Sequence, residues 1–181
     1  AMSLGFLPAI GFAVTATALV GQSVGAHRID DADIALRITG RWVLIWMGVG
    51  MLLYVFAARW IIDIFSNDPE VIAAGTSGLR AIGFSLPLWG IWMVSAGALR
   101  GAGDTRSPMI RGVITVWLAV LFAFLGVHYL DMGVGWVWGT FIVTSPIAAV
   151  GNMLAYRKKS DELRRNFEID PQPLVAPAHQ P

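Results

Sequence analysis

The residues of this sequence that could bind a small molecule are aromatic and weakly polar rather than charged. Trp89 and Trp92 follow Pro87 on one apolar stretch, and the faces of two such rings could attract an organic cation. Packing inside a helix bundle or against lipid is the alternative for both. Pro8 and Pro87 each remove a backbone hydrogen bond within an apolar stretch and can act as hinges. These two rings could therefore line an aromatic pocket beside a hinged helix.

A second polar pattern lies in the last apolar stretch, where residues recur every four positions and share one face of a helix. These residues are Trp136, Thr140, Thr144, Ala148 and Asn152. Such a stripe either forms hydrogen bonds between helices or lines a cavity. Thr15 and Gln22, in the first apolar stretch, are similarly placed for contacts between helices.

Ionisable side chains form no catalytic or metal-binding set in this sequence. His27 and His128 flank apolar stretches, and His179 lies in the C-terminal tail. No two carboxylates share a face at membrane depth, and neither metal-ligand nor Ser/His/Asp spacing occurs. With no Cys, a disulfide scaffold is excluded. We expect no catalytic residue, no metal and no cofactor, and hence a protein that is not an enzyme.

The elements that position these residues follow from composition. Of the 181 residues 56% are hydrophobic and only 14% are charged, with a mean hydropathy of +0.64. Soluble domains carry about 25% charged residues. A helix needs about 20 apolar residues to cross a bilayer, and five stretches are long enough. The predicted fold is therefore an all-α integral membrane protein, a polytopic bundle of five transmembrane helices within residues 1–156. The predicted spans are 3–22, 42–62, 75–99, 112–130 and 133–156.

The short polar connectors contain residues that typically begin a helix. Asn67 or Asp68 can cap a helix whose first turn contains Pro69 and Glu70, so the third helix is expected to run from Pro69 to Leu99. An acidic cluster at 30–33 similarly begins an amphipathic segment that continues into the second span. Residues 157–165 form a basic flank, and residues 166–181, with four Pro and no apolar periodicity, are expected to be disordered.

The basic residues define a topology. Eleven of the thirteen Lys and Arg residues lie on alternate connectors and in the tail, which the positive-inside rule assigns to the cytoplasm. The prediction is a multi-pass protein of the inner (plasma) membrane with a cytoplasmic C-terminus. Five spans then put the N-terminus outside, within an apolar run. We interpret this as a sign that the chain is a fragment, or the product of a truncated gene, of a longer protein.

The third connector holds the most specific motif, within the run SAGALRGAGDTRSPM from Ser95 to Met109. Gly101 and Gly103 free the backbone to turn as the helix leaves the membrane. Asp104 can bond its own loop or cap the next helix, and Pro108 suits that helix's first turn. Arg100 and Arg106 can anchor to phosphate headgroups or pair with Asp104.

Three pairs of Gly in the sequence are spaced four residues apart, and one of them, Gly97 with Gly101, begins in this run. Gly pairs with this spacing favour close packing of membrane helices. We therefore interpret these pairs as sites of contact between helices.

This run resembles the cytoplasmic-loop signature of the multidrug and toxic compound extrusion (MATE) family. Three other passages resemble the same family in order and spacing. They are ALVGQSVGA at 18–26, FSNDPEV at 65–71 and GVGWVWG at 133–139. The resemblance implies helices eight to twelve of a twelve-helix transporter, which is most of its second six-helix lobe. It also assigns a structural or gating role to the loop residues Gly97, Arg100, Gly101, Gly103, Asp104, Thr105 and Pro108.

The family's activity implies efflux of drugs or organic cations by alternating access, driven by Na⁺ or H⁺. The expected partners are such small molecules, the lipid bilayer and the missing N-terminal lobe, with no nucleic acid. Some members carry an acidic residue in the helix that matches 69–99, but 81–99 has none here, so the coupling-ion site is expected outside this chain. A flippase of the same superfamily for lipid-linked sugars, or a membrane packing module that does not transport, is the alternative.

Overall fold

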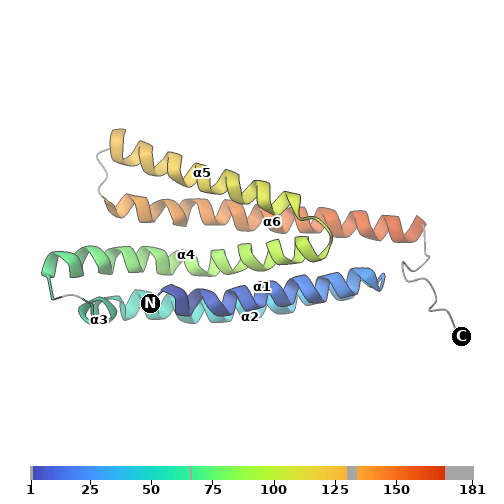
Figure 1. Cartoon of the computed structure of the whole chain (residues 1–181), viewed down its shortest axis with the longest axis horizontal. Coiled ribbons are helices and arrows are strands. Elements are labelled where there is room, and N and C mark those ends of the chain that lie inside the picture. The colour runs from blue at the N-terminus through green and yellow to red at the C-terminus, as the bar shows by residue number, and fades with distance from the viewer. Residues whose placement is uncertain (1, 66, 130–133, 170–181) are drawn as a thin grey trace, which may run out of the picture.

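The computed structural model of the chain describes residues 2–65, 67–129 and 134–169. This part of the chain folds into six helices joined by short turns (Figure 1). They are α1 (Met2–Gly25), α2 (Ile29–Phe56), α3 (Ala58–Asp63), α4 (Pro69–Gly101), α5 (Arg106–Tyr129) and α6 (Val134–Ile169).

Four of these helices are long and apolar enough to cross a bilayer: Leu7–Gly25 in α1, Ile29–Phe56, Pro69–Gly101 and Arg106–Tyr129. The fifth predicted span, 133–156, falls on α6. Residue 133 and several side chains at the start of α6 lie outside the described residues, so this span stays a prediction. The all-α membrane class is confirmed, and four spans are identified within the described chain.

Helix α4 is the central element of the bundle. It contacts every other helix, with α1 and α2 on one side and α5 and α6 on the other (Figure 1). Its start is the one predicted: the Asp68 carboxylate accepts a hydrogen bond of 2.9 Å from the Glu70 N–H, and Pro69 occupies the first position. Asp68, rather than Asn67, is therefore the cap.

The predicted span 42–62 is wrong as one continuous helix. Helix α2 ends at Phe56, Ala57 has a non-helical backbone conformation, and α3 begins at Ala58. A helix end leaves carbonyl groups without partners, and Arg80 of α4 supplies one, because its Nε donates to the Val55 carbonyl at 3.1 Å. The break carries no Gly or Pro, so no local signal in the sequence predicts it.

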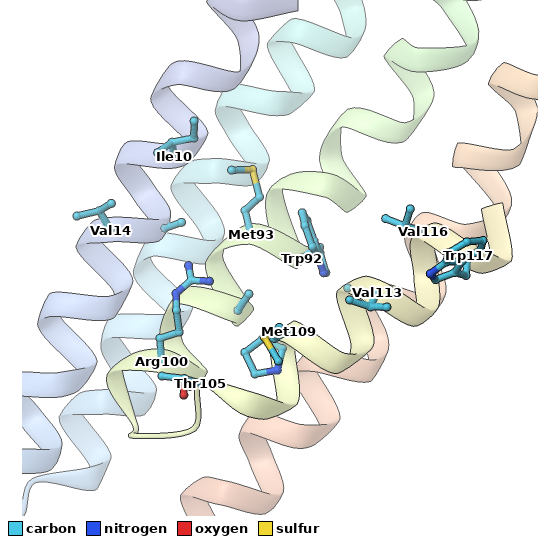
Figure 2. Close-up of a pocket in the computed structure, with 14 residues that line it drawn as sticks. Ile10, Val14, Trp92, Met93, Arg100, Thr105, Met109, Val113, Val116 and Trp117 are labelled. Carbon is cyan, nitrogen blue, oxygen red and sulfur yellow. The ribbon is translucent and has the colours of Figure 1, made fainter. Parts of the chain in front are cut away.

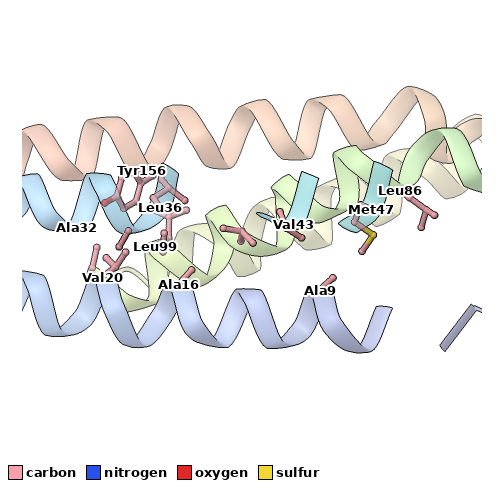
Figure 3. Packing of buried hydrophobic residues seen from close by; sticks show 14 of the residues in the cluster. Ala9, Ala16, Val20, Ala32, Leu36, Val43, Met47, Leu86, Leu99 and Tyr156 are labelled. Carbon is pink, nitrogen blue, oxygen red and sulfur yellow. The ribbon is translucent and has the colours of Figure 1, made fainter. Parts of the chain in front are cut away.

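The core contains many small side chains, which let the helices approach closely. Ala9, Ala16 and Val20 of α1 are fully buried, and Leu99 of α4 packs in the same cluster (Figure 3). Many large hydrophobic side chains lie instead on the outside; Trp117, for example, is 70% exposed. Apolar side chains on the outside are stable against lipid, whereas their exposure to water would cost free energy.

The C-terminal part of α6 continues beyond the bundle and is tied to the start of α2. The Arg164 guanidinium contacts the carboxylates of Asp30 at 2.7 Å and Asp33 at 2.8 Å, and Phe167 stacks on His27. The basic flank 157–165 is therefore helical. The predicted disorder was wrong for residues 166–169, where these contacts stabilise four more helical residues, and residues 170–181 lie outside the described part.

Candidate functional site

Helices α1 and α4 pack closely at the two glycines of the loop motif. A methyl group on Gly97 would lie 2.3 Å from the Ala13 carbonyl oxygen, and one on Gly101 would lie 2.5 Å from the Thr17 carbonyl oxygen. The Thr17 hydroxyl also donates to the Gly97 carbonyl at 2.9 Å. Because only hydrogen fits at both positions, this Gly pair fixes the distance between the two backbones.

The motif next ends α4 and reverses the chain. Gly103 has a positive φ of 84°, its N–H donates to the Arg100 carbonyl, and the Asp104 N–H donates to the Leu99 carbonyl. These two bonds form a Schellman motif, in which glycine adopts the left-handed conformation most easily. The predicted turn is therefore made at Gly103, whereas Gly101 is required for helix packing.

Asp104 then starts α5. Its carboxylate accepts a hydrogen bond of 2.9 Å from the Ser107 N–H in the first turn, where Pro108 also lies. Partial burial opposes ionisation of Asp104. The hydrogen bonds from Ser107, helped by the charges of Arg111 and Lys159, outweigh this effect and hold its pKa below the ordinary value. The predicted capping role of Asp104 thus fits the geometry.

The predicted ion pair of Asp104 with Arg100 or Arg106 does not form among the described side chains. Arg100 instead lines a cavity of about 670 Å³ between α1, α4 and α5. The cavity exists because α5 diverges from α4 and makes no close contact with α1 in the described chain (Figure 1).

Figure 2 shows the walls of this cavity, which we call the larger cavity because it is the larger of the two that Trp92 lines. Ile10 and Val14 come from α1, Trp92 and Met93 from α4, and the opposite wall from α5. The motif residues Arg100, Thr105 and Pro108 line its end near the loop. The structure thus brings part of the loop motif and one of the two predicted tryptophans to a single space.

A smaller cavity of about 140 Å³ lies between α4, α5 and α6. Trp89, Trp92 and Thr144, all predicted cavity residues, line it together with Thr115 and Ser145. The Trp89 and Trp92 rings meet edge to face with centroids 6.1 Å apart. The buried Trp92 Nε1 has no hydrogen-bond acceptor among the described atoms. Trp92 therefore separates the two cavities and carries an unused donor.

Four members of the polar stripe of α6 are buried, but its two hydroxyls do not bond to neighbouring helices in the described chain. Thr140 donates to the Val137 carbonyl and Thr144 to the Thr140 carbonyl, both within α6. A buried hydroxyl finds these acceptors on its own helix more easily than across an interface. Trp136 and Asn152 do reach another helix. The Trp136 Nε1 donates to the Phe122 carbonyl of α5 at 2.9 Å, and Arg111 Nη1 of α5 donates to Asn152 Oδ1 at 3.4 Å.

The other predicted residues lie apart from both cavities. Thr15 is exposed and donates to the Gly11 carbonyl of its own helix, and Gln22 is exposed on the same helix. Neither side chain forms a hydrogen bond to another helix in the described chain, and their contacts between helices stay a prediction. Pro8 and Pro87 are half-buried within helices that continue through them, and their hinge role stays a prediction.

Sequence reasoning missed most of the larger cavity's lining. Met93, Met109 and Val113 are apolar residues in apolar spans, and nothing in their spacing distinguishes a cavity from a lipid-facing surface. Arg111 of α5 faces the buried Asn152, and nothing in the sequence predicts that contact. The divergence of α1 from α5, which creates the cavity, has no signal in the sequence.

Comparison with known proteins agrees with the loop motif. The family model MatE matches residues 1–125. A probable multidrug resistance protein NorM of Thermotoga maritima is 34% identical over 140 residues, covering 75% of this chain and 30% of that protein. A NorM protein of Pseudomonas syringae is 28% identical over 178 residues, covering 93% of this chain and 38% of its own. The chain thus spans about a third of the length of these relatives.

Solved structures show the same fold. An inward-facing MATE family transporter of the MOP superfamily superposes with a TM-score of 0.83 at 20% identity, covering 90% of this chain and 38% of that one. A MOP superfamily transporter from Pyrococcus furiosus gives a TM-score of 0.84 at 22% identity, covering 90% of this chain and 37% of that one. With the family model matching well over half of its residues, the chain belongs to the MATE family of membrane transporters and is not an enzyme.

Proposed function

We propose that this chain forms part of a cation-coupled antiporter that exports drugs or organic cations by alternating access. The observation that supports this most is the pair of adjoining cavities that share Trp92. Together they present Trp89 and Trp92 in a largely apolar setting. Ring faces bind organic cations of varied shape, because cation–π attraction needs little exact geometry. The NorM relatives are named as probable multidrug resistance proteins, which agrees with such a substrate.

The transporting unit we propose is the longer protein, with this chain as most of its second lobe and α1, α2, α4, α5 and α6 as its five spans. Alternating access needs two lobes that move against each other. The coupling ion is Na⁺ or H⁺, and we place its site outside this chain, because α4 has no carboxylate after Glu70.

The charge distribution supports a cytoplasmic C-terminus in the inner membrane. The basic connectors and the flank 157–165 lie at the same end of the bundle, the end at which α6 emerges (Figure 1). The opposite connectors carry Asp63, Asp68 and Glu70. By the positive-inside rule the basic end faces the cytoplasm.

The loop motif then has a structural or gating role at the cytoplasmic end. Gly97 and Gly101 hold α1 against α4, while Gly103 and Asp104 set the angle at which α5 begins. The larger cavity lies between these two junctions. A change in either junction would therefore alter the width of the cavity.

Ethidium accumulation in cells that lack their own efflux pumps tests this proposal. Cells expressing the full-length parent protein are expected to retain less dye. Trp92→Ala is expected to abolish most of that effect, whereas the matched variant Trp60→Ala, whose ring is 72% exposed on α3, is expected to preserve it. Unchanged accumulation at good membrane expression would refute the export of cations.

A second candidate, transport of an anionic substrate such as a lipid-linked sugar, is favoured by Arg100 in the larger cavity. The solved transporter from Pyrococcus furiosus has a binding pocket of reversed polarity, which suggests a different function for that protein. Arg100→Gln separates the candidates. Export of a cation would persist or improve, whereas transport of an anion would be lost.

A further inference from the structure

A third cavity, of about 740 Å³, lies between α2 and α6 at the basic end of the bundle, apart from the two described above. We propose that it binds an anionic phospholipid, with the phosphate among three arginines and an acyl chain along an apolar floor. The arginines are Arg37 and Arg41 of α2 and Arg157 of α6.

The charges at the mouth of this cavity are unbalanced. Arg37 and Arg41 lie one helical turn apart on the same face of α2, where like charges repel. All three arginines are exposed, and none has an ion-pair partner among the described residues. An anion bound between them would relieve this repulsion.

The two nearby carboxylates do not neutralise the site. Asp33 is already bonded to the Arg164 guanidinium at 2.8 Å and accepts a hydrogen bond of 3.0 Å from the Ser160 hydroxyl. Asp161 also lines the cavity and forms no ion pair within the described chain. Three arginines thus face one available carboxylate, which leaves a surplus of two positive charges.

The rest of the cavity suits a hydrocarbon chain. From Arg41 the lining continues along α2 to Leu44 and Ile45, and its floor includes Ile91 of α4 and Met153 of α6. The cavity therefore has a polar end at the arginines and an apolar end further along α2, in the direction in which α2 enters the membrane. Basic pockets of this kind between helices recognise lipid headgroups, and a free phosphate ion would leave the apolar end unfilled.

Lipid binding to the purified chain tests the proposal. Native mass spectrometry would compare phosphatidylglycerol with phosphatidylcholine of the same acyl chains. Each arginine is expected to make about one contact with the headgroup. In the variant Arg37→Gln/Arg41→Gln/Arg157→Gln, which loses these contacts, the affinity for phosphatidylglycerol is therefore expected to fall about tenfold or more. The matched variant Arg28→Gln/Lys158→Gln/Arg165→Gln removes three exposed charges at the same end but outside the cavity. It is expected to lose no more than about threefold.

Three results would overturn the proposal: equal losses in both triple variants, equal binding of both lipids by the unmodified chain, or displacement of the lipid by millimolar inorganic phosphate. Far-UV circular dichroism checks the fold of each variant. Should the triple variant fail to fold, Arg41→Gln alone is expected to lower the affinity severalfold, and an unchanged affinity would then contradict the site.

Discussion

Replacing Gly97 by Ala tests the close packing of α1 on α4. The new methyl group would lie 2.3 Å from the Ala13 carbonyl oxygen, whereas ordinary contact begins at 3.4 Å. The obstacle is backbone and cannot rotate away, so α1 and α4 must separate by about 1 Å. That movement also stretches the bond of 2.9 Å from the Thr17 hydroxyl to the Gly97 carbonyl beyond hydrogen-bond range.

The expected loss of stability combines three effects. Overpacking of this kind costs about 1–3 kcal/mol, and a hydrogen bond between membrane helices contributes about 0.6 kcal/mol. The better helix propensity of Ala offsets up to about 1 kcal/mol. We expect Gly97→Ala to lower the free energy of unfolding by about 1–3 kcal/mol.

The assay is unfolding of the purified chain by sodium dodecyl sulfate in mixed micelles, followed by far-UV circular dichroism. Gly11→Ala is the matched control, because Gly11 lies in the interior of α1 with nothing within 4 Å of a methyl group. This variant is expected to be neutral or more stable by up to about 1 kcal/mol. If Gly97→Ala were as stable as Gly11→Ala, the close packing of α1 on α4 would be refuted.

Three further substitutions probe other junctions. Asp104→Ala is expected to cost about 0.5–2 kcal/mol at neutral pH and to impair turnover more than substrate preference. Because folding lowers the pKa of Asp104, this stabilisation is complete above the ordinary pKa of 3.8 and is lost as pH falls through the folded pKa. The melting temperatures of the unmodified chain and of Asp104→Ala should therefore converge in acid. A difference that stays constant with pH would contradict the cap. Gly126→Ala places a methyl group against the Trp136 indole, which bonds to α5, and should cost about 1–3 kcal/mol in the same detergent titration; full stability would show that the indole lies elsewhere. Arg80→Gln is expected to speed amide hydrogen exchange at the α2–α3 junction and leave α6 unchanged, and equal exchange would refute the contact.

The sequence predicted those parts of the fold that depend on local chemistry. Asp68 and Pro69 begin α4 as capping rules require, and Gly103 and Asp104 turn the chain into α5. Hydropathy found the four spans identified in the described chain because lipid demands continuous apolar helices. The break at Ala57 was missed because its cause is tertiary: Arg80, 25 residues from Val55, accommodates the interrupted helix.

The candidate site was predictable only in part. Trp89, Trp92 and Thr144 were chosen because rings and hydroxyls are unusual inside a span, and they do meet at one cavity. Thr15 was chosen on the same grounds and lies on an exposed face. Residue type gives no information on which face of a membrane helix is buried when all faces are apolar, and the angle between α1 and α5 depends on packing of distant segments.

Transport by the full-length parent protein in proteoliposomes tests the proposed export of cations most directly. With a Na⁺ or H⁺ gradient imposed, we predict movement of ethidium against its own gradient. This movement should stop when an ionophore collapses the ion gradient and should fall sharply in Trp92→Ala but not in Trp60→Ala. Dye movement that is independent of both ion gradients, or equal in the two variants, would contradict the assignment of this chain to a cation-coupled exporter with its cavity at Trp92.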